Sequence, residues 1–239
     1  MKRILVPLLT ALLFLLFAGT ATANLVVDFG IDTTSGSNSG SIFYNGTKLF
    51  GNNIEIDNVS LQPGSPGPSI DLTNGRLYFE TGNLSSYTNN GAMNWQFNTG
   101  GNITITADVI GPGGGTVNTI LLKGTWNNPV QVLGYQTIDG FMLAVTVGSF
   151  VDEKNEWVLR ELGLIEDGDD SLDCFAGPFD GVLNLSFNAM LLDSPPDDKY
   201  FQSTYILSGD VNNQVPIPGA VWLLSSGILC FMGVRRKLK

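Results

Sequence analysis

The most regular stretch of the chain is Asn102-Ile103-Thr104-Ile105-Thr106-Ala107-Asp108-Val109-Ile110, in which apolar and polar side chains alternate. A period of two is typical of a β-strand with one buried and one solvated face. Alternating or β-branched runs recur at residues 25–31, 41–50, 54–61, 76–81, 94–98, 118–126, 141–150, 182–190 and 200–207. About ten short strands at this spacing predict an all-β fold, an antiparallel β-sandwich or jelly roll.

The breaks between these runs carry turn residues. Asn-Gly pairs stand at 45–46, 74–75 and 90–91, and a Gly-rich run covers 111–115. Because Asn and Gly tolerate positive φ, each of these positions predicts a tight turn. Residues 153–164 predict the one helix of the chain, and a strand with an irregular tail is the alternative.

The composition excludes several kinds of active site. None of the 239 residues is His, so the chain cannot build a Ser-His-Asp relay or a zinc site with imidazole ligands. The formal charge of -10 disfavours nucleic acid as a partner, because binding phosphates requires clustered cations.

Residues 1–23 have the order of a secretory signal peptide. A basic start at 1–3 precedes an apolar run over 4–18, and Ala21 and Ala23 fit the small subsites of a signal peptidase. Cleavage there leaves Asn24 as the mature terminus. An uncleaved anchor is the alternative, which the small residues disfavour, so we expect an exported protein.

Residues 215–239 have the composition of a membrane-spanning helix with a basic end. The run over 215–234 is uncharged and has 20 residues, about the number that a transmembrane helix needs. Four cations follow within five residues, which predicts a cytoplasmic end and disfavours a glycosylphosphatidylinositol signal. The motif, the span and the tail include Val215, Pro216, Ile217, Pro218, Trp222, Arg235, Arg236 and Lys237.

This order of a proline motif, a short Trp- and Leu-rich span and an Arg-Arg-Lys cluster resembles the PEP-CTERM sorting signal of bacterial exported proteins. The resemblance covers residues 215–239, and Ile217 lies between the two prolines, where the family has Glu. It implies that an exosortase, a transpeptidase-like membrane enzyme, processes the tail near Pro216 and Pro218. It also implies a membrane-anchored precursor that reaches the cell surface or the extracellular space.

With both ends set aside, residues 24–207 predict one exported domain and residues 208–214 a stalk before the membrane. Six cations and 22 acids over 24–214 give this part a formal charge of -16. Cys174 lies in the predicted exported domain and Cys230 within the predicted membrane span, so they cannot form a disulfide. We expect Cys174 to be a buried, unreactive thiol.

Two groups of acidic residues are candidates for chemistry. Residues 166–173 hold five carboxylates, which predicts either a calcium site or a solvated acidic loop. The candidate calcium ligands are Asp167, Asp169, Asp170 and Asp173. Glu55 and Asp57 share one face of a predicted strand, and an exposed strand face is favoured over a catalytic dyad because no second Glu follows.

Aromatic side chains offer a further candidate site. A sugar-stacking platform could include Tyr44, Tyr78, Tyr87, Trp95, Trp126 and Tyr135, although we expect half or more of them in the core. These observations favour a structural or adhesive role in the cell envelope or extracellular matrix, without enzymatic activity. The alternative is a lectin-like module or a glycoside-active enzyme with an extracellular polysaccharide as ligand. Calcium is the one candidate cofactor.

Overall fold

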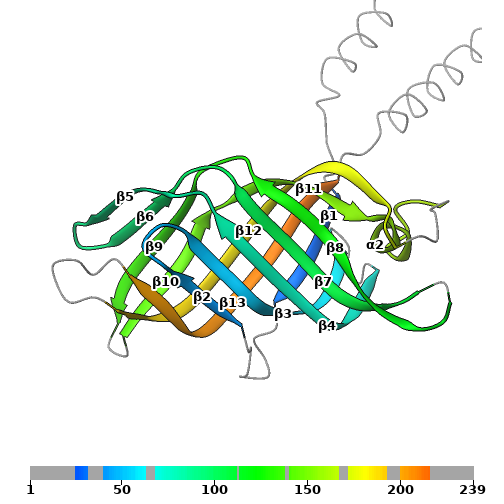
Figure 1. Ribbon diagram of the computed structural model, residues 1–239, viewed down its shortest axis with the longest axis horizontal. Coiled ribbons are helices and arrows are strands. Elements are labelled where there is room, and N and C mark those ends of the chain that lie inside the picture. The colour runs from blue at the N-terminus through cyan, green and yellow to red at the C-terminus, as the bar shows by residue number, and fades with distance from the viewer. Residues whose placement is uncertain are drawn as a thin grey trace, which may run out of the picture. The chain divides into compact units, whose positions relative to one another are not determined.

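The computed structural model describes residues 25–31, 40–62, 68–111, 113–137, 140–166, 172–192 and 200–215 (Figure 1). The signal-peptide residues and the sorting-signal residues after Val215 lie outside this part of the chain. Val215 is the last residue of a strand. Among the described residues, no helix is long and apolar enough to cross a membrane.

The described residues are almost entirely β-structure, and their strands pair antiparallel, which confirms the predicted all-β class. The elements are β1 (Leu25–Ile31), β2 (Ser41–Tyr44), β3 (Leu49–Gln62), β4 (Ser69–Thr81), β5 (Leu84–Asn89), β6 (Met93–Phe97), β7 (Gly101–Ile110), β8 (Thr116–Trp126), β9 (Val130–Thr137), β10 (Gly140–Val147), β11 (Ser149–Asn155), α2 (Glu156–Glu161), β12 (Phe175–Leu191) and β13 (Phe201–Val215). Helix α2 and the β5–β6 hairpin lie at opposite ends of the sheet (Figure 1).

Eight strands close into a barrel. The order β13-β2-β3-β4-β7-β8-β11-β12 returns to its start because β12 also pairs with β13. Strand β1 pairs with the end of β3 that β2 does not reach. Strands β10, β9, β6 and β5 extend the sheet from β12. A sandwich or jelly roll, which needs two separate sheets, is not confirmed, since the pairing runs through one 13-stranded sheet.

Alternation along the strands places the core inside the barrel. In β7, Ile103, Ile105, Ala107 and Val109 are buried, whereas the residues between them are at least partly exposed. Large aromatic rings fill the interior, and the Trp126 ring contacts Phe79 and Phe150 edge-on, with ring centroids 6.1 and 5.4 Å away. Burying each such side chain contributes about 1.5–3 kcal/mol.

Two local predictions are wrong, and the predicted helix is present but shorter than expected. Asn74 and Gly75 lie within β4, where Asn74 has a φ of 52° and the register shifts against β7, so this Asn-Gly pair forms a bulge rather than a turn. The helix covers only Glu156–Glu161, because β11 continues to Asn155, whose side chain caps the helix by accepting from Trp157 N at 2.9 Å. Cys174 is partly exposed rather than buried.

The predicted stalk is also part of the barrel. Residues 208–214 belong to β13 and pair with β12 from Ser186 to Asp180. The segment looks polar because Asp210, Asn212 and Gln214 face outward, although Val211 and Asn213 between them are buried. A mostly polar segment can therefore be a strand of the barrel, provided that every second side chain is buried.

Candidate functional site

Three aromatic side chains, Phe43, Phe50 and Tyr78, lie on the outside of the barrel, and we call them the aromatic face. Phe43 lies between two buried residues of β2, and Phe79, next to Tyr78 in β4, is buried too. Because successive side chains of a strand point to opposite sides, these three rings are directed outward. Phe43 and Phe50 are partly buried, and Tyr78 is 36% exposed.

The strand register aligns the aromatic face with polar side chains in one row. Gln202 of β13 lies opposite Phe43, and Phe43 lies opposite Phe50. Phe50 in turn lies opposite Glu80, and Glu80 opposite Asn102 of β7. The Phe43 and Phe50 rings stack with their centroids 5.1 Å apart and 13° between their planes. The row therefore crosses five strands with two stacked rings at its centre.

A shallow hollow lies on each side of Phe43. One, of about 300 Å³, is lined among others by Phe50, Asn52, Tyr78, Glu80 and Asn102. The other, of about 520 Å³, is lined by Ser41, Phe43, Tyr44, Asn45, Leu192, Tyr200 and Gln202. Tyr200 stacks on Tyr44 with the ring centroids 5.6 Å apart. Both hollows combine aromatic rings with amide groups.

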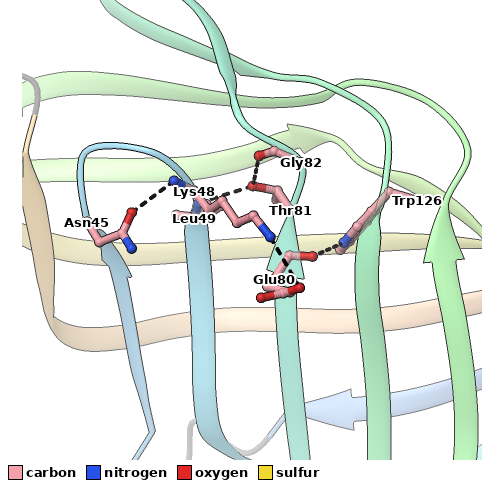
Figure 2. Close-up of polar contacts among 7 residues, drawn as sticks. All are labelled: Asn45, Lys48, Leu49, Glu80, Thr81, Gly82 and Trp126. Atoms are coloured by element: carbon pink, nitrogen blue, oxygen red, sulfur yellow. Dashed lines mark hydrogen bonds and ion pairs between the residues drawn. The ribbon is translucent and has the colours of Figure 1, made fainter.

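Hydrogen bonds at the ends of β2, β3 and β4 hold this surface in place (Figure 2). Asn45 Oδ1 accepts from the backbone N–H groups of Thr47 and Lys48, both at 2.9 Å, and so closes the β2–β3 turn. The buried Thr81 hydroxyl accepts from Leu49 N at 3.0 Å and donates to the carbonyl of Gly82 at 2.9 Å. The turn next to Phe43 and the strand ends near Phe50 are thereby fixed.

The charged groups of the site form one ion pair. Lys48 Nζ lies 3.4 Å from Glu80 Oε1, with about one third of each side chain exposed to solvent. The backbone carbonyl of Glu80 also accepts from the indole N–H of the core residue Trp126 at 2.8 Å (Figure 2). A pair this exposed adds little stability. The Glu80 carboxylate, which lines the hollow beside Phe50, remains able to bind a ligand there.

The aromatic residues singled out from the sequence divide between core and surface. Tyr44, Trp95 and Trp126 are buried, which confirms that at least half of the six belong to the core. Tyr78 belongs to the aromatic face, whereas Tyr135 is 47% exposed on β9. The sequence reading missed Phe43 and Phe50. The Asn45-Gly46 turn between them was the available signal, because a hairpin pairs residues on either side of its turn.

The two acidic candidates have different outcomes. Glu55 lies on the outer face of β3, where its carboxylate is 3.1 Å from the Arg76 guanidinium. Asp167, Asp169 and Asp170 lie outside the described residues, and Asp173 is exposed. Within the described ranges, no three Asp, Glu, Cys or His side chains group as metal ligands. The calcium site stays a prediction.

Comparison with known proteins supplies no relative. No protein-family model, curated protein or solved structure matches the chain. We therefore infer its function from the aromatic face and from the sequence of its two ends.

Proposed function

We propose that this chain is an exported protein of the cell envelope or extracellular matrix with an adhesive role, and that it binds a neutral polysaccharide on the aromatic face. The observation that carries the proposal is the row from Gln202 through Phe43, Phe50 and Glu80 to Asn102. It places two stacked rings between hydrogen-bonding side chains on one rigid surface.

The chemistry of this row matches that of a sugar chain. A pyranose ring has C–H groups that pack on an aromatic ring and hydroxyls that both donate and accept hydrogen bonds. Amides such as those of Asn52 and Asn102 also donate and accept, whereas the Glu80 carboxylate accepts only. Because the hollows are shallow and lie side by side, they suit successive units of a polymer better than one enclosed small molecule.

The charge of the domain favours an uncharged polymer. Six cations and 22 acids over 24–214 repel polyanions. A sulfated or uronic-acid polymer would have to approach this surface against that repulsion. A neutral glucan, mannan or chitin-like chain would meet no such barrier.

The site supports binding rather than hydrolysis. Glycosidases use two carboxyl groups on opposite sides of the scissile bond, about 5–10 Å apart. Among the described residues, Glu80 is the only carboxylate that lines the hollow beside Phe50, and it is paired with Lys48. We therefore propose no enzymatic activity, in preference to the glycoside-active alternative.

The sequence of the two ends supports the cellular part of the proposal. A signal peptide ending at Ala23 would direct export, and the tail over 215–239 would hold a precursor in the membrane. An exosortase-type enzyme would then process the tail near Pro216 and Pro218, so that the domain reaches the cell surface or the extracellular space.

The test is a depletion assay with insoluble polysaccharides. The purified full chain in detergent is incubated with cellulose, chitin and a neutral α-glucan, and the bound fraction is measured. We expect binding to at least one polymer, and the Phe43→Ser/Phe50→Ser variant to raise its Kd about 30-fold, if each lost stacking contact contributes about 1 kcal/mol.

The matched control is Val117→Ser/Tyr135→Ser, which removes two exposed apolar side chains from β8 and β9. This variant should bind like the wild type. Equal binding by the Phe43→Ser/Phe50→Ser variant, or no binding of any polymer by the wild type, would contradict the proposal.

A further inference from the structure

Three polar side chains are buried together inside the barrel. Asp152 and Lys154 come from β11, and Asn213 comes from β13. Asp152 is 1% exposed, and Lys154 and Asn213 are completely buried. Lysine and aspartate are almost never fully buried unless they are paired. The arrangement of these three side chains therefore calls for a specific explanation.

One carboxylate holds both an amine and an amide. Lys154 Nζ lies 2.7 Å from Asp152 Oδ2, and Asn213 Nδ2 donates to the other oxygen, Oδ1, at 3.0 Å. The carbonyl oxygen of the same amide, Asn213 Oδ1, is buried and has no hydrogen-bond partner among the described residues. The Lys154 ammonium also lies 4.2 Å from the centre of the Phe179 ring. The Lys154 amine and the Asn213 amide thus bind the two oxygens of one buried carboxylate, that of Asp152.

Glycines on the neighbouring strands make room for this arrangement. Gly181 of β12 lies opposite Asn213, and a Cβ atom there would be 2.3 Å from Asn213 Nδ2 and from the Phe150 ring. Gly124 of β8 lies opposite Asp152, and a Cβ atom there would be 2.9 Å from Asp152 Cβ. Any other residue at Gly181 would displace the amide from the carboxylate.

Burial favours the uncharged forms of both titratable groups. Burial lowers the pKa of Lys154 from 10.5 to about 8, against the opposing effect of Asp152. Burial also raises the pKa of Asp152, and nearby Asp180 raises it further, although Lys154 acts in the opposite direction. A proton that passes from Lys154 to Asp152 leaves a neutral amine, which is a nucleophile, and a neutral acid, which is a proton donor.

We propose that Lys154 Nζ and Asn213 Cγ react to form an intramolecular amide bond between β11 and β13, with Asp152 as the proton carrier. This modification site does not depend on the proposed polysaccharide binding. Its basis is the shared carboxylate, the burial of all three side chains and the unpartnered carbonyl oxygen of Asn213.

The reaction balances without any other reactant. Rotation of the Asn213 amide by half a turn brings Oδ1 to the protonated Asp152, which polarises the carbonyl. Lys154 Nζ attacks Cγ, the Cγ–Nδ2 bond breaks, and the nitrogen leaves as ammonia. Of the two protons that the ammonium loses, one completes the ammonia and the other stays on Asp152. No oxidant or reductant is consumed, and the net charge of the site stays at zero.

The bond is detected by peptide mapping of the full chain. Trypsin normally cuts after Lys154, so the unlinked protein releases separate peptides covering 124–154 and 155–160. In the linked protein this cut is blocked. We expect a branched peptide that joins residues 124–160 to the peptide starting at Tyr200, with a mass lower by one ammonia than the sum of the two chains.

Variants assign the roles. Lys154→Met and Asp152→Asn should each give only linear peptides, whereas the matched controls Lys123→Met and Asn212→Ser should keep the branch. In Lys123→Met the branched peptide starts at Leu77, because trypsin no longer cuts after residue 123. Succinimide at an Asn-Gly pair also loses ammonia, but it joins no two peptides.

The proposal is overturned if the wild-type digest contains only linear forms of both peptides. These are the peptide that ends at Lys154 and the peptide that starts at Tyr200 with an unmodified Asn213. This result needs no variant to fold. A branched peptide in the Asp152→Asn variant would overturn the assignment of Asp152 as proton carrier.

Discussion

Replacing Lys154 by methionine should destabilise the barrel by an amount that depends on pH. Lys154 is the cation next to the buried carboxylate of Asp152, and both side chains are completely shielded from solvent. Methionine keeps the apolar stem but leaves Asp152 buried without a counter-charge. Breaking a buried pair in this way costs about 3–5 kcal/mol.

An upper limit on this cost follows from protonation. Asp152 can avoid being buried as an unpaired charge by binding a proton. Binding that proton costs about 1.4 kcal/mol for each pH unit above the ordinary pKa of the carboxyl group. With that value at 3.8, the limit is about 4.4 kcal/mol at pH 7 and about 1.6 kcal/mol at pH 5. The folded state of the variant then binds a proton that the unfolded state releases. Its stability therefore falls as the pH rises above 3.8.

The reference is the double variant Asp152→Asn/Lys154→Met, which removes both charges. Neither variant can form the amide bond to Asn213, so the comparison isolates the unpaired carboxylate. At pH 7 we expect Lys154→Met to unfold at a urea concentration about 1–2 M below that of the double variant. This range assumes that the free energy of unfolding falls by about 2–3 kcal/mol per M of urea. The gap should shrink at pH 5.

Lys123→Met provides the control for loss of a lysine. Lys123 pairs with Glu153 at 3.1 Å, but about half of each side chain is exposed. Its removal should change stability by less than about 1 kcal/mol. Equal urea midpoints for the single and double variants at pH 7 would refute the reasoning, because Asp152 would then carry no penalty without Lys154.

Three further predictions test other parts of the molecule. Thr81→Val should lower the free energy of unfolding in urea by about 1–3 kcal/mol, because Leu49 N loses its buried acceptor. The control Thr119→Val should lower it by less, because the Thr119 hydroxyl makes a long hydrogen bond of 3.4 Å. Burial, with help from Asp210, raises the pKa of Asp28, so Asp28→Asn should raise the thermal midpoint at neutral pH, and the gain should vanish in acid, where Asp28 is protonated in both states. If the loop at 166–173 binds calcium, calcium should raise the thermal midpoint above that in sodium at matched ionic strength, and Asp167→Asn/Asp169→Asn should abolish the difference. Equal midpoints in the two salts would indicate a solvated loop.

The local periodicity of the sequence predicts most strands, because alternation is a local property. The run over 102–110 corresponds to β7 within one residue. Closure of the barrel is not local, since it depends on β12 pairing with β13 along most of their lengths. The segment 208–214 looked like a stalk because its outward residues are polar. The Asn-Gly pair at 74–75 predicts a turn, but the positive φ of Asn74 belongs to a bulge within β4.

The buried cluster could not be found from the sequence for a similar reason. Asp152 and Lys154 fall at the boundary of the predicted helix, where alternating charges suggest a solvated face. Once the segment is known to be a strand, both residues lie on the same side as Phe150, which is buried. Asn213 comes from the distant strand β13, and only the register of β12 with its two neighbours brings it to Asp152.

The position of the proposed bond would matter if the tail over 215–239 anchors the protein, as proposed above. β13 ends at Val215, two residues after Asn213. A load applied beyond that end would first separate Gln214 from Asp180, and then Asn213 from Gly181. With Asn213 joined to Lys154, the load passes into β11 through a covalent bond after the first of these pairs. The hydrogen bonds further along β13, up to the pairing of Gln202 with Phe43, then bear none of it. An adhesive face beginning at Gln202 would therefore keep its geometry under a force that would otherwise peel β13 from the barrel.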